Sequence, residues 1–204
     1  MLLLGLIAAA GAAPTTYSFD SAASKLYVQV YRDRDSLASS MAHDHVVAAT
    51  GWSGSLTLDP DNIAACAVSV RVPVSGLRPD LPDMRRLVGY DVMLTDAQQK
   101  QVDEHMKGEE QLKQSAFSDI RFEATRCSGT MAALSATGTL TVAGHGGPVT
   151  ISVKADTRDG GLRLRGGLRT SHTSLGLVPY SAFFGSLKNQ DGLDFTLDVV
   201  ARAN

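Results

Sequence analysis

The fold is decided by the stretch Cys66-Ala67-Val68-Ser69-Val70-Arg71-Val72-Pro73-Val74, in which every even-numbered position carries an apolar side chain. Successive side chains of a β-strand leave opposite faces, so this strict alternation predicts a strand with one dry and one wet face. Strand patterns recur along the chain, and together they predict about eight strands: residues 25–31, 50–58, 64–75, 120–127, 136–143, 149–157, 162–170 and 193–202. Tight turns such as Gly146-Gly147-Pro148 and Asp159-Gly160-Gly161 join neighbouring strands and indicate an antiparallel meander.

Eight half-buried strands need either a second sheet or closure of one sheet on itself. Gly51 and Gly54 interrupt a strand pattern, and glycines in strands mark bends where a sheet curves. The sequence therefore favours a single all-β domain, residues 14–204, built as an eight-stranded antiparallel barrel. Alternation directs one set of side chains inward: Val68, Val70, Val72, Phe122, Leu140, Val142, Val149, Ile151, Val153, Leu162, Leu164, Phe195 and Leu197.

One segment lacks the strand period. Between residues 76 and 116 the alternation disappears, and Thr95 is followed three positions later by Gln98. This is a capping box, which predicts one short helix between the third and fourth strands, ending near Gly108. Its apolar face is thin, so we expect the helix to lie over an end or flank of the barrel.

Composition and the first residues bear on location and partners. The 204 residues hold 19 basic and 21 acidic side chains, a net charge of −2, so net charge does not point to nucleic acid as a partner. Residues 1–13 form an apolar stretch that is too short to span a bilayer and ends in small residues, which predicts a signal peptide. No later segment reads as a stable membrane span. We therefore expect a periplasmic or secreted protein.

Cys66 and Cys127 are the two cysteines of the chain, and export would place them in an oxidising compartment. If strand 64–75 pairs antiparallel with strand 119–127 so that Val74 faces Ile120, Cys66 falls within about one residue of Cys127. A cross-strand disulfide follows from that register; two free buried thiols are the alternative.

Residues 175–187 break the alternation and carry Leu177, Tyr180, Phe183 and Phe184. Large aromatics outside a strand or helix pattern are expected to cover or enter something apolar. The segment is either a loop that caps the core or a wall or lid of a ligand cavity.

Histidines form the main polar cluster. His43 and His45 lie two apart, so on an extended strand both rings leave one face. They can make structural hydrogen bonds, contact a ligand head group, or supply two metal ligands, in which case His145 and His172 are candidates to complete the site. The chain contains no GxSxG motif, phosphate loop or CxxC pair, so we expect neither an enzyme nor a cofactor.

Taken in order, several short pieces resemble the YceI-like, lipocalin-like proteins of bacterial envelopes. The pieces span nearly all of residues 14–204: Tyr17-Ser18-Phe19-Asp20 with Ser24, Trp52-Ser53-Gly54, Val70 to Ser75, His105-Met106, Phe117 to Phe122, Gly138 to Gly146, and Ser174-Leu175-Gly176-Leu177. The resemblance implies an elongated eight-stranded barrel whose apolar tunnel holds an isoprenoid or fatty-acyl lipid without catalysis. It also implies that His105 lines the pocket. The chain departs from the family pattern in its His43-Asp44-His45 cluster and in the length of segment 77–100.

The resulting functional hypothesis is binding, storage or transport of an amphipathic lipid. Its expected ligand-binding residues are His43, His45, Val70, Val72, His105, Phe122, Leu140, Ile151, Leu177, Tyr180, Phe183 and Phe184. The alternatives are a metal-binding protein or metal-dependent enzyme that uses His43, His45 and His145, and an interaction module with a solidly packed barrel. Monomer and homodimer are both compatible with these observations.

Overall fold

The computed structural model describes residues 13–204. The expected signal peptide, residues 1–13, lies outside the described residues apart from its last position. The strands are β1 (Thr15–Arg32), β2 (His45–Ala49), β3 (Ser53–Leu58), β4 (Cys66–Pro73), β5 (Leu77–Pro79), β6 (Asp119–Thr130), β7 (Ala133–Val142), β8 (His145–Arg158), β9 (Gly161–Ser171), β10 (Ser181–Ala182) and β11 (Leu187–Ala203). The helices are α1 (Pro82–Leu87) and α2 (Asp96–Lys107), with short 3-10 turns η1 (Ser39–Met41), η2 (Val74–Gly76), η3 (Thr173–Leu175) and η4 (Phe183–Gly185).

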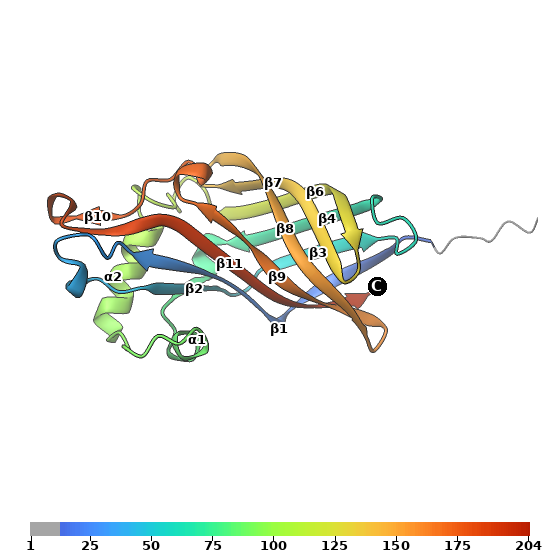
Figure 1. The fold of residues 1–204 in the computed structure, drawn as a ribbon, viewed down its shortest axis with the longest axis horizontal. Coiled ribbons are helices and arrows are strands. Elements are labelled where there is room, and N and C mark those ends of the chain that lie inside the picture. The colour runs from blue at the N-terminus through green and yellow to red at the C-terminus, as the bar shows by residue number, and fades with distance from the viewer. Residues whose placement is uncertain (1–12) are drawn as a thin grey trace, which may run out of the picture.

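Among the described residues, eight strands close into an antiparallel barrel in the order β1-β3-β4-β6-β7-β8-β9-β11 and back to β1 (Figure 1). Each strand pairs with the next barrel strand along the chain, so the expected all-β barrel and its meander order are confirmed. The closing ladder joins the two ends of the domain, from Tyr17 opposite Ala203 to Arg32 opposite Asn189. Closure leaves none of the eight with a long free edge.

Strand β1 pairs with β11 along one edge and with two strands, β3 and then β2, along the other, because it bends. Its register against β11 shifts between Asp20 and Lys25. Before the bend β1 pairs with β3, and after it β1 pairs with β2, which in turn pairs with β5. Ser24 holds the bend: its hydroxyl donates to the Asp20 carbonyl at 2.6 Å and accepts from the Val200 N–H at 2.9 Å. The bend opens one end of the barrel to the segment that follows β4.

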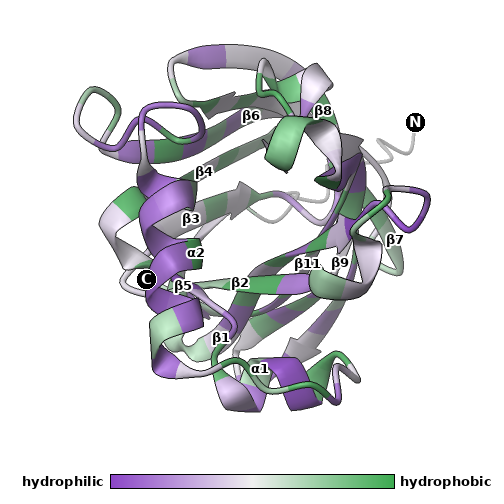
Figure 2. Cartoon of the chain, turned by 90° about the vertical axis from the view of Figure 1, so that its left-hand side faces the viewer, coloured by the Kyte–Doolittle hydropathy of each residue, from purple (hydrophilic) through white to green (hydrophobic). Residues whose placement is uncertain are grey.

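That segment holds more structure than the sequence predicted. The helix expected from the capping box is α2, where the Thr95 side chain accepts from the Gln98 N–H. Strand β5 and helix α1 precede α2. The prediction of a single helix in this segment was therefore wrong, because the segment also contains a short strand and a second helix. Pro82 starts α1, and proline fits there because the first helical N–H has no partner inside the helix. Figure 2 views the barrel from the end at which α2 lies.

The register between β4 and β6 differs from the expected one. Val72, not Val74, faces Ile120, a displacement of two residues. A two-residue shift preserves which side chains face inward. All thirteen side chains expected inside the barrel accordingly belong to its apolar core or pack against it.

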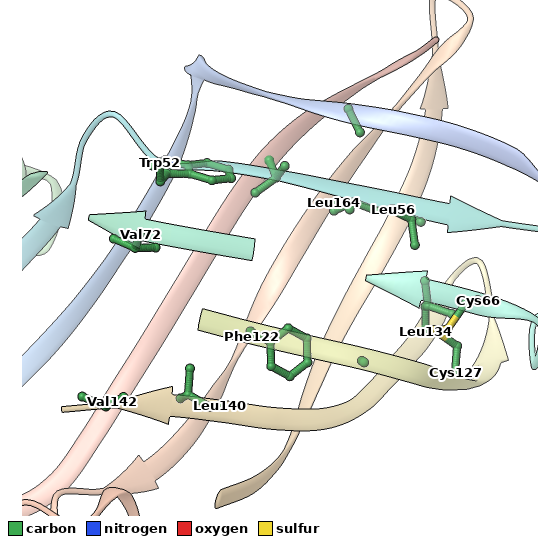
Figure 3. Packing of buried hydrophobic residues seen from close by; sticks show 14 of the residues in the cluster. Trp52, Leu56, Cys66, Val72, Phe122, Cys127, Leu134, Leu140, Val142 and Leu164 are labelled. Atoms are coloured by element: carbon green, nitrogen blue, oxygen red, sulfur yellow. A yellow bond between two sulfur atoms is a disulfide. The ribbon is translucent and has the colours of Figure 1, made fainter. Parts of the chain in front are cut away.

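The disulfide between Cys66 and Cys127 is formed, with Cα atoms 5.8 Å apart, and the prediction of a cross-strand bond is confirmed. Figure 3 shows the bond beside Leu134, in the same apolar cluster as Leu56 and Phe122. The bridged residues are 61 positions apart, and closing a loop of that length limits the unfolded chain by about 4 kcal/mol in the loop-entropy account.

We predict that the double variant Cys66→Ala/Cys127→Ala loses about 2–4 kcal/mol of unfolding free energy, because its unfolded chain regains the freedom of that loop. Urea unfolding monitored by circular dichroism measures the loss. The matched control is the unchanged protein with and without reductant. Equal midpoints for the oxidised protein and the double variant would contradict the prediction.

Candidate ligand-binding cavity

The barrel encloses a cavity of about 330 Å³. This volume lies in the range of about 300–1,000 Å³ typical of small-molecule sites. All eight barrel strands contribute lining side chains, and nearly all of these are aliphatic or aromatic. The polar lining residues are few, among them His45, His105, His172 and Asn189. No lysine or arginine of the described residues lines the cavity.

The barrel is filled at one end and hollow in its middle. Near the disulfide, Leu58 is 1% exposed and Ala201 is 0% exposed. Val70, Ile151 and Phe195 also face inward, yet each keeps part of its surface accessible. Inward side chains of a close-packed core would have no such surface. The accessible part therefore faces the cavity.

The other end of the cavity is bordered by α2 and by the loop between β9 and β10. Val102, His105 and Met106 of α2 line the cavity there, as do Leu177 and Tyr180 of the loop. The His105 and Tyr180 rings stack, with centroids 5.3 Å apart and planes 24° apart. We call this end the mouth.

A buried ionic cluster lies beside the mouth, made of His45, Asp80 and Arg85. Asp80 is 0% exposed and Arg85 is 2% exposed. An Arg85 guanidinium nitrogen donates to Asp80 Oδ1 at 2.6 Å, and His45 Nδ1 lies 2.7 Å from Asp80 Oδ2. The Val46 N–H also donates to Asp80 Oδ1, at 3.2 Å. Every oxygen of the buried carboxylate thus has a partner, as burial of a charge requires.

Hydrogen bonds determine the protonation state of Asp80. Burial alone raises the pKa of Asp80, but the hydrogen bonds from His45, Arg85 and the Val46 N–H outweigh it, so the pKa lies below its usual value. Asp80 is therefore a carboxylate, and its Oδ2 accepts a hydrogen bond from the N–H at His45 Nδ1. His45 also lines the cavity, so the cluster borders the space that a ligand would occupy. Burial, with His45 and Arg85 nearby, lowers the pKa of His43.

The structure gathers most of the expected ligand-binding residues around the cavity. The lining includes His45, Val70, Val72, His105, Phe122, Leu140, Ile151, Leu177 and Tyr180. His43 precedes β2 and does not line the cavity, so the two histidines do not act from one strand face as expected. Phe183 and Phe184 are 69% and 110% exposed. The expectation that these two rings cover the opening was wrong, because they sit on a hairpin end that points into solvent.

Sequence reasoning missed Asp80 and Arg85. The available signal was Asp80 between Pro79 and Pro82, in a segment already noted as longer than the family pattern. Nothing local indicated that an acidic residue there would be buried, because its partner His45 lies 35 residues away.

The metal alternative finds no support in the part of the chain that the structure describes. No three His, Cys, Asp or Glu side chains of residues 13–204 are grouped so that they could hold a metal ion. His45 is bonded to Asp80, and His145 lies at the turn between β7 and β8, against Gly176. No helix among the same residues has the length and apolar character needed to cross a membrane.

An antiparallel barrel with an enclosed apolar cavity and a partly polar mouth defines the class of hollow ligand-binding barrels. The chain matches the family model described as "YceI-like domain" over residues 17–199. It therefore belongs to the YceI-like family, as its resemblance indicated.

Solved structures share this fold. BcnA from Burkholderia cenocepacia superposes with a TM-score of 0.67 at 15% identity, covering 89% of this chain and 98% of BcnA. A polyisoprenoid binding domain from Saccharophagus degradans, implicated in plant cell wall breakdown, gives 0.60 at 9% identity, covering 93% and 99%. The YceI protein of Campylobacter jejuni gives 0.55 at 12% identity, covering 78% and 84%. No curated protein matches the sequence.

We predict that Asp80→Asn costs about 3–5 kcal/mol of unfolding free energy, because it leaves Arg85 buried without a counter-charge. The matched control is Asp198→Asn, which breaks a partly exposed pair with Arg163 at 2.6 Å and should cost less than about 1 kcal/mol. Chemical denaturation of both variants at pH 7 makes the comparison. Similar losses would contradict the importance of burial.

The cost of Asp80→Asn should also depend on pH. Since folding lowers the pKa of Asp80, its contribution is complete above the unfolded value of about 3.9 and is lost as the pH falls through the lower folded value. The stabilities of the variant and the unchanged protein should therefore converge below about pH 4. A constant difference down to pH 2 would contradict this assignment.

Proposed function

We propose that this protein binds one amphipathic lipid, with a polyisoprenoid or fatty-acyl tail, inside the barrel, and stores or transports it. The enclosed apolar cavity is the observation that carries the proposal. Apolar surface leaving water contributes about 25 cal/mol per Å², or about 0.8 kcal/mol for each buried methylene. Affinity should therefore rise with tail length until the cavity is full.

The arrangement of polar groups orients the ligand in this proposal. The disulfide end is closed by buried aliphatic side chains and suits the tail. His45, His105 and Tyr180 lie at or near the mouth and suit a polar head group. A lipid bound this way keeps its head near water and its tail dry.

The comparisons support a ligand of this kind. The Saccharophagus degradans structure of the same fold is described as a polyisoprenoid binding domain. Binding needs neither catalysis nor a cofactor. Residues 1–13 as a signal peptide, together with a disulfide of the kind that persists in oxidising compartments, support action in the bacterial envelope or outside the cell.

The two alternatives differ from this proposal in observable ways. A metal-dependent function requires at least one more ligand beside His45, and the described residues supply no such group. A solidly packed interaction module requires the inward side chains of the middle strands to be fully buried, and Val68, Val70 and Ile151 are not.

We predict that native mass spectrometry of gently purified protein shows one bound lipid, which organic extraction removes. Added fatty acids should then rebind, with affinity increasing along a series of chain lengths. Protein that carries no lipid and binds none of the series would overturn the proposed function.

Neighbouring residues of β4 supply a matched pair of variants. Val70 lines the cavity, whereas Arg71 faces out and pairs with Asp119 at 2.9 Å. Val70→Asp should weaken binding of a pyrene-labelled fatty acid by about tenfold or more, because an unpaired charge enters the apolar site. Arg71→Ala should leave binding unchanged and cost less than about 1 kcal/mol of stability. Equal effects on binding would contradict the assigned facing.

A further inference from the structure

Four large apolar side chains project from the mouth end of the molecule: Leu37, Met41, Phe183 and Phe184. Their exposed fractions are 94%, 69%, 69% and 110%. We call this group the apolar tip. Single exposed apolar residues are ordinary on soluble proteins, but a group of large ones at one end marks an interaction site.

Backbone hydrogen bonds hold the two parts of the tip together. Phe183 and Phe184 form the end of the β10–β11 hairpin, in which Ser181 pairs with Lys188. The loop that carries Leu37 and Met41 lies against this hairpin: the Ala38 N–H donates to the Ser186 carbonyl at 2.7 Å, and the Asp33 N–H donates to the Lys188 carbonyl at 2.8 Å. Figure 1 shows β10 at the same end of the molecule as α2.

The backbone at the end of the hairpin is strained. Phe183 and Phe184 have φ angles of 50° and 55°, in the left-handed region, and Gly185 follows at 84°. For a non-glycine residue this region costs about 1–2 kcal/mol. Glycine or asparagine would relieve the strain at both positions, and the rings make no buried contacts that repay it. Strain of this kind is characteristic of functional sites.

The tip continues the rim of the cavity. Tyr180 and Asn189 both line the cavity, and the Asn189 N–H donates to the Tyr180 carbonyl at 2.9 Å. Phe183 and Phe184 lie three and four residues beyond Tyr180, so at about 3.3 Å per strand residue their backbone reaches at most about 10–13 Å past the rim. A surface that the two rings enter therefore lies next to the mouth of the cavity.

Charge near the tip is sparse and balanced. Residues 36–42 carry no charged side chain, and residues 175–190 carry one, Lys188, and no acidic one. Lys188 pairs with Asp33 at 3.2 Å, and Arg34 and Asp35 are the remaining charges beside Leu37. An uncharged projection can enter the interface of a bilayer without removing an ion from water, and the balanced flank has no preference for anionic lipid.

We propose that the apolar tip docks this protein on the surface of a lipid bilayer and sets the mouth of the cavity against it. This inference rests on the proposed function, because a lipid tail that enters the cavity has a membrane as its source or destination. Phe183 and Phe184 enter the interfacial region, where aromatic rings are favoured. A tail can then pass between bilayer and cavity without crossing water.

Flotation with phosphatidylcholine vesicles tests the docking. The unchanged protein should float with the vesicles, equally at low and high salt. Phe183→Ser/Phe184→Ser should partition about tenfold or more weakly, since it removes two large apolar side chains from the contact. The control is Val92→Ser, which alters a side chain that is 57% exposed outside the tip and should change nothing.

A fluorescent variant reports the position of the tip. In Phe184→Trp the new indole should shift to the blue when vesicles are added and should be quenched by brominated lipid. The native Trp52 is 3% exposed and lines the cavity, so the unchanged protein titrated with the same vesicles supplies the background to subtract. An unshifted spectrum would overturn the insertion of the tip.

The outcomes separate this inference from the proposed function. Docking is overturned if the unchanged protein ignores vesicles, or if the serine double variant floats equally well, even where both bind pyrene-labelled fatty acid in solution. It is also overturned if the double variant abolishes a dimer seen by analytical ultracentrifugation and the unchanged protein does not float, because a second copy then covers the tip. Failure to bind the fatty acid, with docking intact, overturns the proposed function alone.

Discussion

Pairing of β1 with β11 is the constraint on which the rest of the structure depends. It joins the first and last strands of the domain and gives every barrel strand two neighbours. An eight-stranded barrel is just wide enough to be filled by side chains or to hold one small ligand. Here the disulfide end takes the first option and the middle takes the second. The apolar interior exists because the closed ladder surrounds the inward faces, and an open sheet of the same strands would leave them exposed to water.

Features of this fold could be predicted from the sequence where the pattern that indicates them lies in neighbouring residues. Inward facing was predictable because alternation is a property of neighbouring residues, and it survived a two-residue error in the β4–β6 register. The disulfide forms for a different reason: a register shift in β6 between Ala124 and Arg126 turns Cys127 to the inward face, which alternation alone does not predict. The register itself is not recorded by alternation, because a shift of two residues leaves the same side chains facing inward. Asp80 could not be placed because burial of a carboxylate depends on His45 and Arg85 arriving from other elements. Phe183 and Phe184 were misplaced because apolarity predicts burial, and here the backbone turns both rings outward.

The buried Asp80 cluster explains how a long insertion is held at the mouth. Within segment 77–95, Leu77 belongs to the main core, and Met84 packs with Val46 and Ala48 in a second, small core outside it. Arg85 adds hydrogen bonds to the carbonyls of Val92 and Asp44, at 2.6 and 2.9 Å, and its guanidinium lies 5.2 Å from the centre of the Tyr90 ring. These bonds have directions, which apolar contacts lack. A buried ion pair adds little net stability compared with an apolar replacement, but it fixes one geometry because every other arrangement leaves a charge unpaired.

The two ends of the barrel are therefore held by interactions of different strength. At the closed end a covalent bond and fully buried aliphatic side chains resist opening. At the mouth, the rings of His105 in α2 and Tyr180 in the β9–β10 loop stack, and Gln111, in the turn after α2, donates to the Val178 carbonyl at 3.1 Å. Interactions of these kinds contribute about 1 kcal/mol each. Local opening follows the weakest contacts, so we expect the mouth to be the end that opens while the closed ladder and the disulfide stay intact. A lipid can then enter or leave by parting α2 from the loop, without unfolding the sheet that encloses it.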